Sequence, residues 1–197
     1  MTMTSAAILT GGRARRFDGR DKSQLTVGGR TILERQLDAL RGVVDHVWLA
    51  GYHGTEPLPT PLRALPDRKP DHGPLAGLDA ALTAEPHGNI LLLACDMPNV
   101  TGPLLAHLVR QLDDVDAVVP RTERGYHPLC AVYAASCRAA VQRRLDEGHL
   151  RMQDLLTDLR IRTVEGPELA SFGQPDWLLA NVNTQAALDA LESQQNH

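Results

Sequence analysis

The sequence predicts an α/β fold, with one doubly wound, mostly parallel sheet and helices on both of its faces. Apolar runs of strand length recur along the chain, with segments of helical periodicity between them. Several of these runs are apolar throughout, as expected for strands that helices cover on both sides. The length of 197 residues suits a single domain, residues 1–197, and no linker divides the chain.

The strands are expected at five apolar runs, which are Ala6 to Leu9, His46 to Ala50, Ile90 to Ala94, Ala117 to Val119 and Leu129 to Tyr133. The helices are expected where apolar residues recur every three or four positions. These segments are Thr31 to Leu40, Leu75 to Leu82 and Pro103 to Leu112. Because alternating strands and helices build a parallel sheet, ligands are expected beyond the carboxyl ends of the strands.

Composition argues against several classes of partner. The formal net charge of −4 gives no basic excess, so neither nucleic acid nor an anionic membrane is an expected partner. No apolar run reaches the roughly 18 residues of a membrane span, and no charged region precedes the first run, so a cytoplasmic protein is expected. The three cysteines form no CxxC pair and are interpreted as buried structural thiols.

The first apolar run ends at Gly11 and Gly12, and four arginines and Lys22 follow within ten residues. Glycine lets backbone N–H groups approach an anion, and arginine and lysine neutralise phosphate charge. The stretch therefore predicts a polyphosphate-binding loop, although it matches neither a P-loop nor a GxGxxG fingerprint. A purely steric use of the glycines, or a solvated basic loop, is the alternative interpretation.

Asp96 follows the third apolar run directly, and we expect it to face the ligand crevice. Mg²⁺ is commonly held by one or two carboxylates together with substrate phosphates and water, so one aspartate is chemically sufficient. The alternative role is an N-cap for the helix that follows, but Thr101 is itself a suitable cap residue.

A proline- and glycine-rich loop leads from Asp67 to Gly77, where small residues would let a flat group lie against the chain. Asp67 follows a short apolar strand and is a candidate for hydrogen bonds to a base or ribose, or else a turn-forming residue. His72 and His127 lack the spacing of metal ligands, so zinc is not expected.

In this order, the motifs resemble the molybdenum cofactor guanylyltransferase family, which has a Rossmann-like nucleotidyltransferase fold. The family pattern LAGGxAxRMGGxDK matches residues 9–22, GPLAG matches 73–77, and CDxP matches 95–98. The family's HP pair, its glycine-then-arginine turn and its NVNT motif match 127–128, 148–151 and 181–184. The resemblance covers nearly the whole chain.

The resemblance implies transfer of GMP from GTP to the phosphate of molybdopterin, with release of pyrophosphate and with Mg²⁺ as cofactor. The N-terminal half would bind the nucleotide, with Asp96 as metal ligand and Arg16 and Lys22 on the phosphates. By the same resemblance, the residues expected to contact GTP are Leu9, Thr10, Gly11, Gly12, Lys22, Asp67, Gly77 and Asp96. Because the attacking phosphate is already ionised, no strong general base is needed.

The C-terminal half would bind molybdopterin through His127, Arg151, Asn181 and Asn183. Capping of a helix expected from Gln185 to Leu191 is the alternative role of the two asparagines. A monomer is expected, docking transiently with cofactor-synthesis enzymes or with the apoenzyme that receives the product.

Three positions depart from the family pattern. Thr10 replaces an alanine and Asp18 a glycine, while Ala50 stands where some members place an asparagine that contacts the nucleotide. Because Ala50 lacks the side chain for that contact, the sequence indicates nucleotidyl transfer more firmly than it indicates a preference for guanine. The alternatives are therefore a CTP-dependent molybdopterin cytidylyltransferase, a nucleotidyltransferase for another phosphorylated small molecule, and a non-catalytic nucleotide- or cofactor-binding protein.

Overall fold

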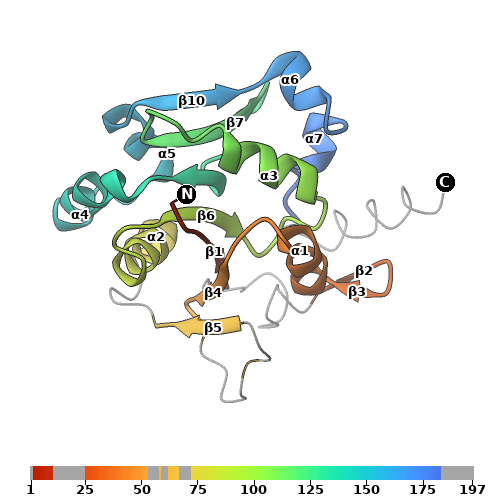
Figure 1. Cartoon of the computed structure of the whole chain (residues 1–197), viewed down its shortest axis with the longest axis horizontal. Coiled ribbons are helices and arrows are strands. Elements are labelled where there is room, and N and C mark those ends of the chain that lie inside the picture. The colour runs from red at the N-terminus through yellow and green to blue at the C-terminus, as the bar shows by residue number, and fades with distance from the viewer. Residues whose placement is uncertain (1, 11–24, 53–57, 59–61, 67–71, 183–197) are drawn as a thin grey trace.

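The structure is a computed structural model that describes residues 2–10, 25–52, 58, 62–66 and 72–182. Its architecture is one twisted sheet between two layers of helices (Figure 1). Within these ranges every helix is too short or too polar to cross a bilayer.

The main sheet has eight strands, seven of them in the order β10-β7-β9-β6-β1-β4-β5. Their bounds are β1 Thr4–Leu9, β4 His46–Ala50, β5 Leu62–Leu65, β6 Asn89–Ala94, β7 Ala117–Thr122, β9 Cys130–Tyr133 and β10 Ile161–Val164. The eighth strand, β8 (Gly125–Tyr126), pairs with the end of β7. A separate hairpin joins β2 (Thr26–Val27) to β3 (Arg30–Thr31).

The predicted mostly parallel sheet is confirmed, although β9 and the short β8 are antiparallel to their neighbours. β1 runs parallel to both β4 and β6, and β5 and β10 are parallel to their neighbours. β9 is antiparallel to β6 and β7. Its reversal follows from the short connection after β7, because a parallel return needs a crossover of a dozen or more residues. The direction of this strand was not part of the sequence prediction.

Helices cover both faces of the sheet. Their bounds are α1 Ile32–Leu40, α2 Gly73–Ala84, α3 Gly102–Arg110, α4 Arg138–Asp146, α5 Met152–Leu155, α6 Gly166–Ala170 and α7 Pro175–Leu178. Short 3₁₀ turns lie at Ala135–Cys137 and Leu156–Asp158. Figure 1 shows α1 with α3 on one side of the central strands and α2 with α4 on the other.

Side chains of the central strand alternate between two apolar cores. Ala6 and Ile8 of β1 pack into the core under α1 and α3, whereas Ala7 and Leu9 pack into the core under α2 and α4. This alternation follows from the two-residue period of a strand. It explains why β1 is apolar at each position from Ala6 to Leu9, the run that the sequence prediction used.

The three predicted helices are confirmed, with small shifts of their ends. Thr31 is the N-cap of α1 and forms a capping box with Glu34. Thr101 occupies the N-cap position of α3, but its side chain makes no capping bond. Its Oγ1 is buried and has no hydrogen-bond partner among the described residues. Thr101 is therefore the cap residue of α3 by position, as the sequence suggested, but its hydroxyl does not bind the helix terminus.

The three cysteines are free and buried, as predicted. Burial raises the pKa of Cys130 and of Cys137 to about 12, so both remain neutral thiols at physiological pH. Their role in this fold is packing.

Candidate active site at the carboxyl edge of the sheet

The loop after β1 begins between the ends of β4 and β6. The backbone N–H of Thr10 donates to the Ala50 carbonyl at 2.9 Å, and the Thr10 hydroxyl donates to the same oxygen at 3.1 Å. On the other side, the N–H of Cys95 donates to the Leu9 carbonyl at 3.3 Å. Two of the three departures from the family pattern, Thr10 and Ala50, therefore contact each other.

Gly77 lets α2 pack closely against the end of β1. A Cβ added at Gly77 would lie 2.4 Å from Cδ2 of Leu9 and 3.5 Å from Cβ of Ala50. Gly77 was predicted to leave room for a flat ligand, but in this structure the Leu9 side chain fills that space. The glycine therefore has a packing role here, and its contact with a nucleotide stays a prediction.

Asp96 lies in the turn after β6 and is half-buried. Its Oδ1 accepts a hydrogen bond from Nδ2 of Asn181 at 2.7 Å, and its backbone carbonyl accepts one from the N–H of Val182 at 2.8 Å. These bonds bring the C-terminal segment to the carboxylate predicted to bind metal. They also show a partner for the Asn181 side chain other than a helix terminus.

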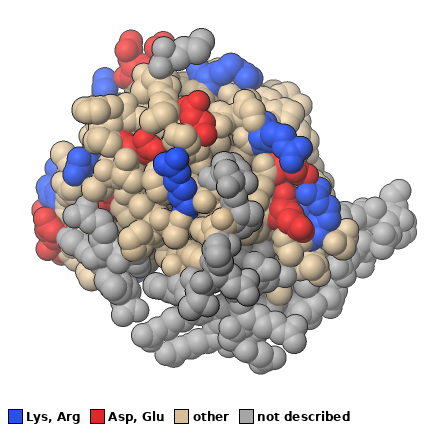
Figure 2. All heavy atoms as spheres, turned by 60° about the horizontal axis from the view of Figure 1, so that its bottom comes forward, with Lys and Arg blue, Asp and Glu red and all other residues tan. Residues whose placement is uncertain are grey.

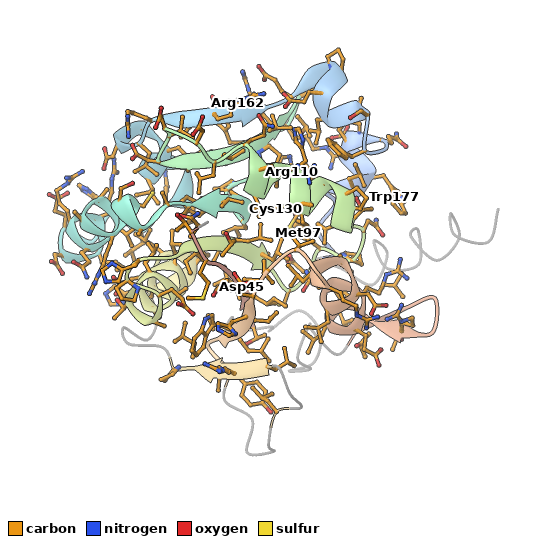
Figure 3. The ribbon with its side chains drawn as sticks, viewed as in Figure 1. Asp45, Met97, Arg110, Cys130, Arg162 and Trp177 are labelled. Carbon is orange, nitrogen blue, oxygen red and sulfur yellow. The ribbon has the colours of Figure 1, made fainter. Side chains whose placement is uncertain are left out.

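A cavity of about 390 Å³ opens beside this turn. Its lining residues are Pro74, Met97, Tyr126, His127, Pro128, Leu129, Cys130, Leu150, Arg151, Met152, Gln153 and Asn181. Met97 and Cys130 of this set lie close together at the centre of Figure 3. The cavity thus brings together three residues predicted for the acceptor side: His127, Arg151 and Asn181.

His127 is half-buried in the cavity wall and is held in place by its neighbours. Its Nε2 lies 3.0 Å from Oγ1 of Thr122, and its backbone N–H donates to the Pro120 carbonyl at 2.9 Å. Burial lowers the pKa of His127, Asp176 raises it in part, and Arg124 lowers it further. The side chain is therefore suited to hydrogen bonding as a neutral imidazole at neutral pH.

Arg151 is exposed at the rim of the cavity, where it precedes α5. Within the described part of the chain, its guanidinium has neither an acidic partner nor a hydrogen bond. An exposed arginine beside a cavity suits a phosphate group, because the guanidinium fork can bind two oxygens.

Tyr126 and Gln153 line the same cavity but were not predicted from the sequence. The Tyr126 ring has the guanidinium carbon of Arg121 5.3 Å from its centroid, a cation–π arrangement. Gln153 Nε2 donates to the Tyr126 carbonyl at 2.9 Å. The position of Tyr126 directly before the His127–Pro128 pair was the available clue.

Six predicted site residues lie outside the described residues: Gly11, Gly12, Arg16, Lys22, Asp67 and Asn183. So does the helix expected from Gln185 to Leu191. The described site therefore consists of the ends of β1 and β6, the start of α2 and the cavity.

The described side chains offer one carboxylate at this edge, with no cluster of three or more acidic, histidine or cysteine residues suited to a metal. Figure 2 shows positive and negative side chains interspersed over the described surface of one face.

Comparisons with known proteins agree with this arrangement. A protein from Desulfosudis oleivorans named molybdenum cofactor guanylyltransferase is 29% identical over 201 residues, covering 98% of this chain and 96% of that protein. A Haloferax mediterranei protein, named "Probable molybdenum cofactor guanylyltransferase", is 32% identical over 203 residues, covering 98% and 95%.

The fold is also found in a solved structure, that of molybdopterin-guanine dinucleotide biosynthesis protein A from Archaeoglobus fulgidus. The two structures superpose with a TM-score of 0.78 over 98% of each chain, at 23% identity. A family model described as the MobA-like NTP transferase domain matches residues 6–163, which include most of β1, the Asp96 turn and most of the cavity. This chain therefore belongs to the MobA-like NTP transferase family.

Proposed function

We propose that this nucleotidyltransferase transfers GMP from GTP to the phosphate of molybdopterin, releases pyrophosphate, and uses Mg²⁺. The observation that carries the proposal is the position of Asn181. Its side chain lines the cavity and also donates to Asp96 at 2.7 Å. A phosphorylated acceptor in the cavity would therefore lie next to the carboxylate at the nucleotide edge of the sheet.

Asp96 suits a hard cation such as Mg²⁺. Carboxylate oxygen is a preferred ligand, and a site with one carboxylate completes its shell with substrate phosphates and water. Bound there, Mg²⁺ would supply neutralisation of charge on the phosphate oxygens. The hydrogen bond from Asn181 to Oδ1 would orient the carboxylate toward a bound metal.

The residues of the cavity would orient the acceptor. Arg151 would bind its phosphate, while neutral His127 and the amide of Gln153 would offer hydrogen bonds to polar groups of the ring system. Apolar side chains of Leu129, Leu150 and Met152 line the remaining wall. An acceptor phosphate is ionised at neutral pH, so the chain needs to align it rather than deprotonate it.

The test is to incubate the purified protein with molybdopterin, Mg²⁺ and each of the four nucleoside triphosphates, following pyrophosphate release. Turnover that prefers GTP and depends on molybdopterin is expected. Preference for CTP would instead indicate a cytidylyltransferase. Absence of turnover with every nucleotide, while nucleotide still binds, would indicate a non-catalytic binding protein and overturn the proposal.

A further inference from the structure

Gln36 is a polar residue on the buried face of α1. It is fully buried, as is Ile32 one turn earlier, and Leu40 one turn later is 2% exposed. Burying an amide is unfavourable by about 1–3 kcal/mol in proteins unless its groups are hydrogen-bonded. A glutamine between two apolar core residues therefore calls for a specific partner.

The partner of Gln36 is the turn that carries Asp96. Its Nε2 donates to the Ala94 carbonyl at 2.7 Å and to the Met97 carbonyl at 3.2 Å. These two carbonyls lie on either side of Cys95 and Asp96 in the chain. One amide group thus holds both ends of the turn.

The oxygen of the same amide has no partner among the described residues. Since both contacts of Gln36 are with carbonyl oxygens, only its NH₂ group can make them. Position 36 therefore requires a hydrogen-bond donor, and a complete amide group is not needed.

The neighbouring residue, Arg35, also binds the segment that follows β6. Arg35 Nε donates to the Pro98 carbonyl at 3.1 Å, and its NH1 donates to the Val27 carbonyl at 3.2 Å. Val27 belongs to the hairpin that follows Lys22 closely in the chain. Asn181 and Val182 also bind Asp96, so both α1 and the C-terminal segment hold the turn.

We propose that Gln36 is a positioning residue, which fixes the backbone of the Asp96 turn so that the carboxylate can hold the metal–nucleotide complex. This inference rests on the proposed function, because it requires Asp96 to bind metal. Loss of the two hydrogen bonds would let the turn relax, including Met97 at the edge of the cavity, while His127 and Arg151, to which Gln36 makes no hydrogen bond, would keep their positions.

Two variants test the role. Gln36→Leu has similar length and no donor. Gln36→Glu donates only when protonated, and burial near Asp96 raises the pKa of a carboxyl group. We expect the dissociation constant of Mn²⁺ with nucleotide, measured by electron paramagnetic resonance, to rise about tenfold or more in Gln36→Leu, equivalent to about 1.4 kcal/mol.

The glutamate variant adds a pH signature. Its Mn²⁺ affinity relative to wild type should recover as the pH is lowered, because the protonated carboxyl regains one O–H donor for a carbonyl. The KM for the acceptor should change less than kcat in both variants. Leu40→Ala is the matched control, since it removes core packing from the same helix face but removes no hydrogen bond to the turn.

The outcomes separate the two proposals. Wild-type protein that binds Mn²⁺–nucleotide but transfers nothing would overturn the proposed function alone. If Gln36→Leu and Gln36→Glu bind Mn²⁺ like wild type at every pH, the positioning role is wrong. Equal losses of Mn²⁺ affinity in Gln36→Leu and Leu40→Ala, measured well below their melting temperatures, would likewise reduce Gln36 to a structural residue.

Discussion

Asn181 and Asp96 are 85 positions apart in the chain, yet Nδ2 of one lies 2.7 Å from Oδ1 of the other. The contact joins the segment after α7 to the turn after β6. It therefore links the cavity to the carboxyl edge of the sheet through two side chains in direct contact.

Removal of the Asn181 amide should weaken catalysis without unfolding the protein. A hydrogen bond to a charged group contributes about 1.5–3 kcal/mol, so Asn181→Ala should lower kcat about tenfold to a hundredfold.

Asp96→Asn should keep the fold and lose most of the activity, because it removes the carboxylate proposed to bind Mg²⁺. Steady-state kinetics with thermal denaturation would measure both effects.

The two substitutions should not be additive, because each removes the same pair. If Asn181→Ala lowers kcat as much in the Asp96→Asn background as in wild type, the two residues act independently and the contact has no catalytic role.

Gly77→Ala should destabilise the protein. The helix propensity of alanine favours the change by up to about 1 kcal/mol, but the new Cβ would lie 2.4 Å from Cδ2 of buried Leu9. Overpacking of this kind costs about 1–3 kcal/mol. Urea denaturation should therefore show a lower midpoint with an unchanged slope.

Truncation of the Leu9 side chain supplies the control for the Gly77→Ala prediction. In a Leu9→Ala background, the added methyl group has room, and Gly77→Ala should be neutral or stabilising. An equal loss in both backgrounds would show that contact with Leu9 is not the reason for glycine at this position.

Local patterns were sufficient to predict the centre of the fold. The run from His46 to Ala50 coincides with β4, and the apolar residues before Leu9 and Ala94 mark the ends of β1 and β6. β1 and β6 are buried on both faces, so their composition alone distinguishes them. The direction of β9 depends instead on the length of a connection.

The C-terminal elements were harder to predict. α4, with the sequence RAAVQRRLD, is strongly polar and buries only Val141 and Leu145. Its position depends on packing against α2, a long-range contact. The later helices are of four or five residues, too short for a periodic pattern.

Within the site, motifs indicated which residues matter but not how they meet. His127, Arg151 and Asn181 belong to three separate motifs, and their convergence on one cavity requires the fold. Gln36 belongs to no motif. Its role follows from two backbone carbonyls on a strand and turn about sixty residues later, which no local pattern reveals.

Arg151→Gln should weaken binding of the acceptor alone. The guanidinium has no partner within the described part of the chain, so stability should stay within about 0.5 kcal/mol of wild type. Loss of a charged contact to phosphate should raise the KM for molybdopterin about tenfold or more, with the KM for GTP unchanged. Steady-state kinetics with each substrate varied in turn would measure this.

Arg110→Gln is a matched control for this substitution, since Arg110 is exposed on α3 and does not line the cavity. It should change neither KM. If both variants raise the KM for molybdopterin equally, general electrostatic attraction explains the effect rather than a contact with Arg151.

The pKa of His127 should lie below its usual value of 6.5, because burial disfavours the charged imidazolium. NMR titration of its ring proton would measure the midpoint. Asp176→Asn should lower the midpoint further, since the carboxylate favours the cation, and Arg124→Gln should raise it.

The lowered pKa of His127 also makes the stability of the protein depend on pH. Because the folded state binds protons more weakly than the unfolded state, the contribution of His127 to the free energy of unfolding is fully present above the unfolded pKa and declines as the pH falls below it. The wild type should therefore lose stability relative to His127→Gln on acidification from neutral pH, and a midpoint at or above 6.5 would contradict this account of the cavity wall.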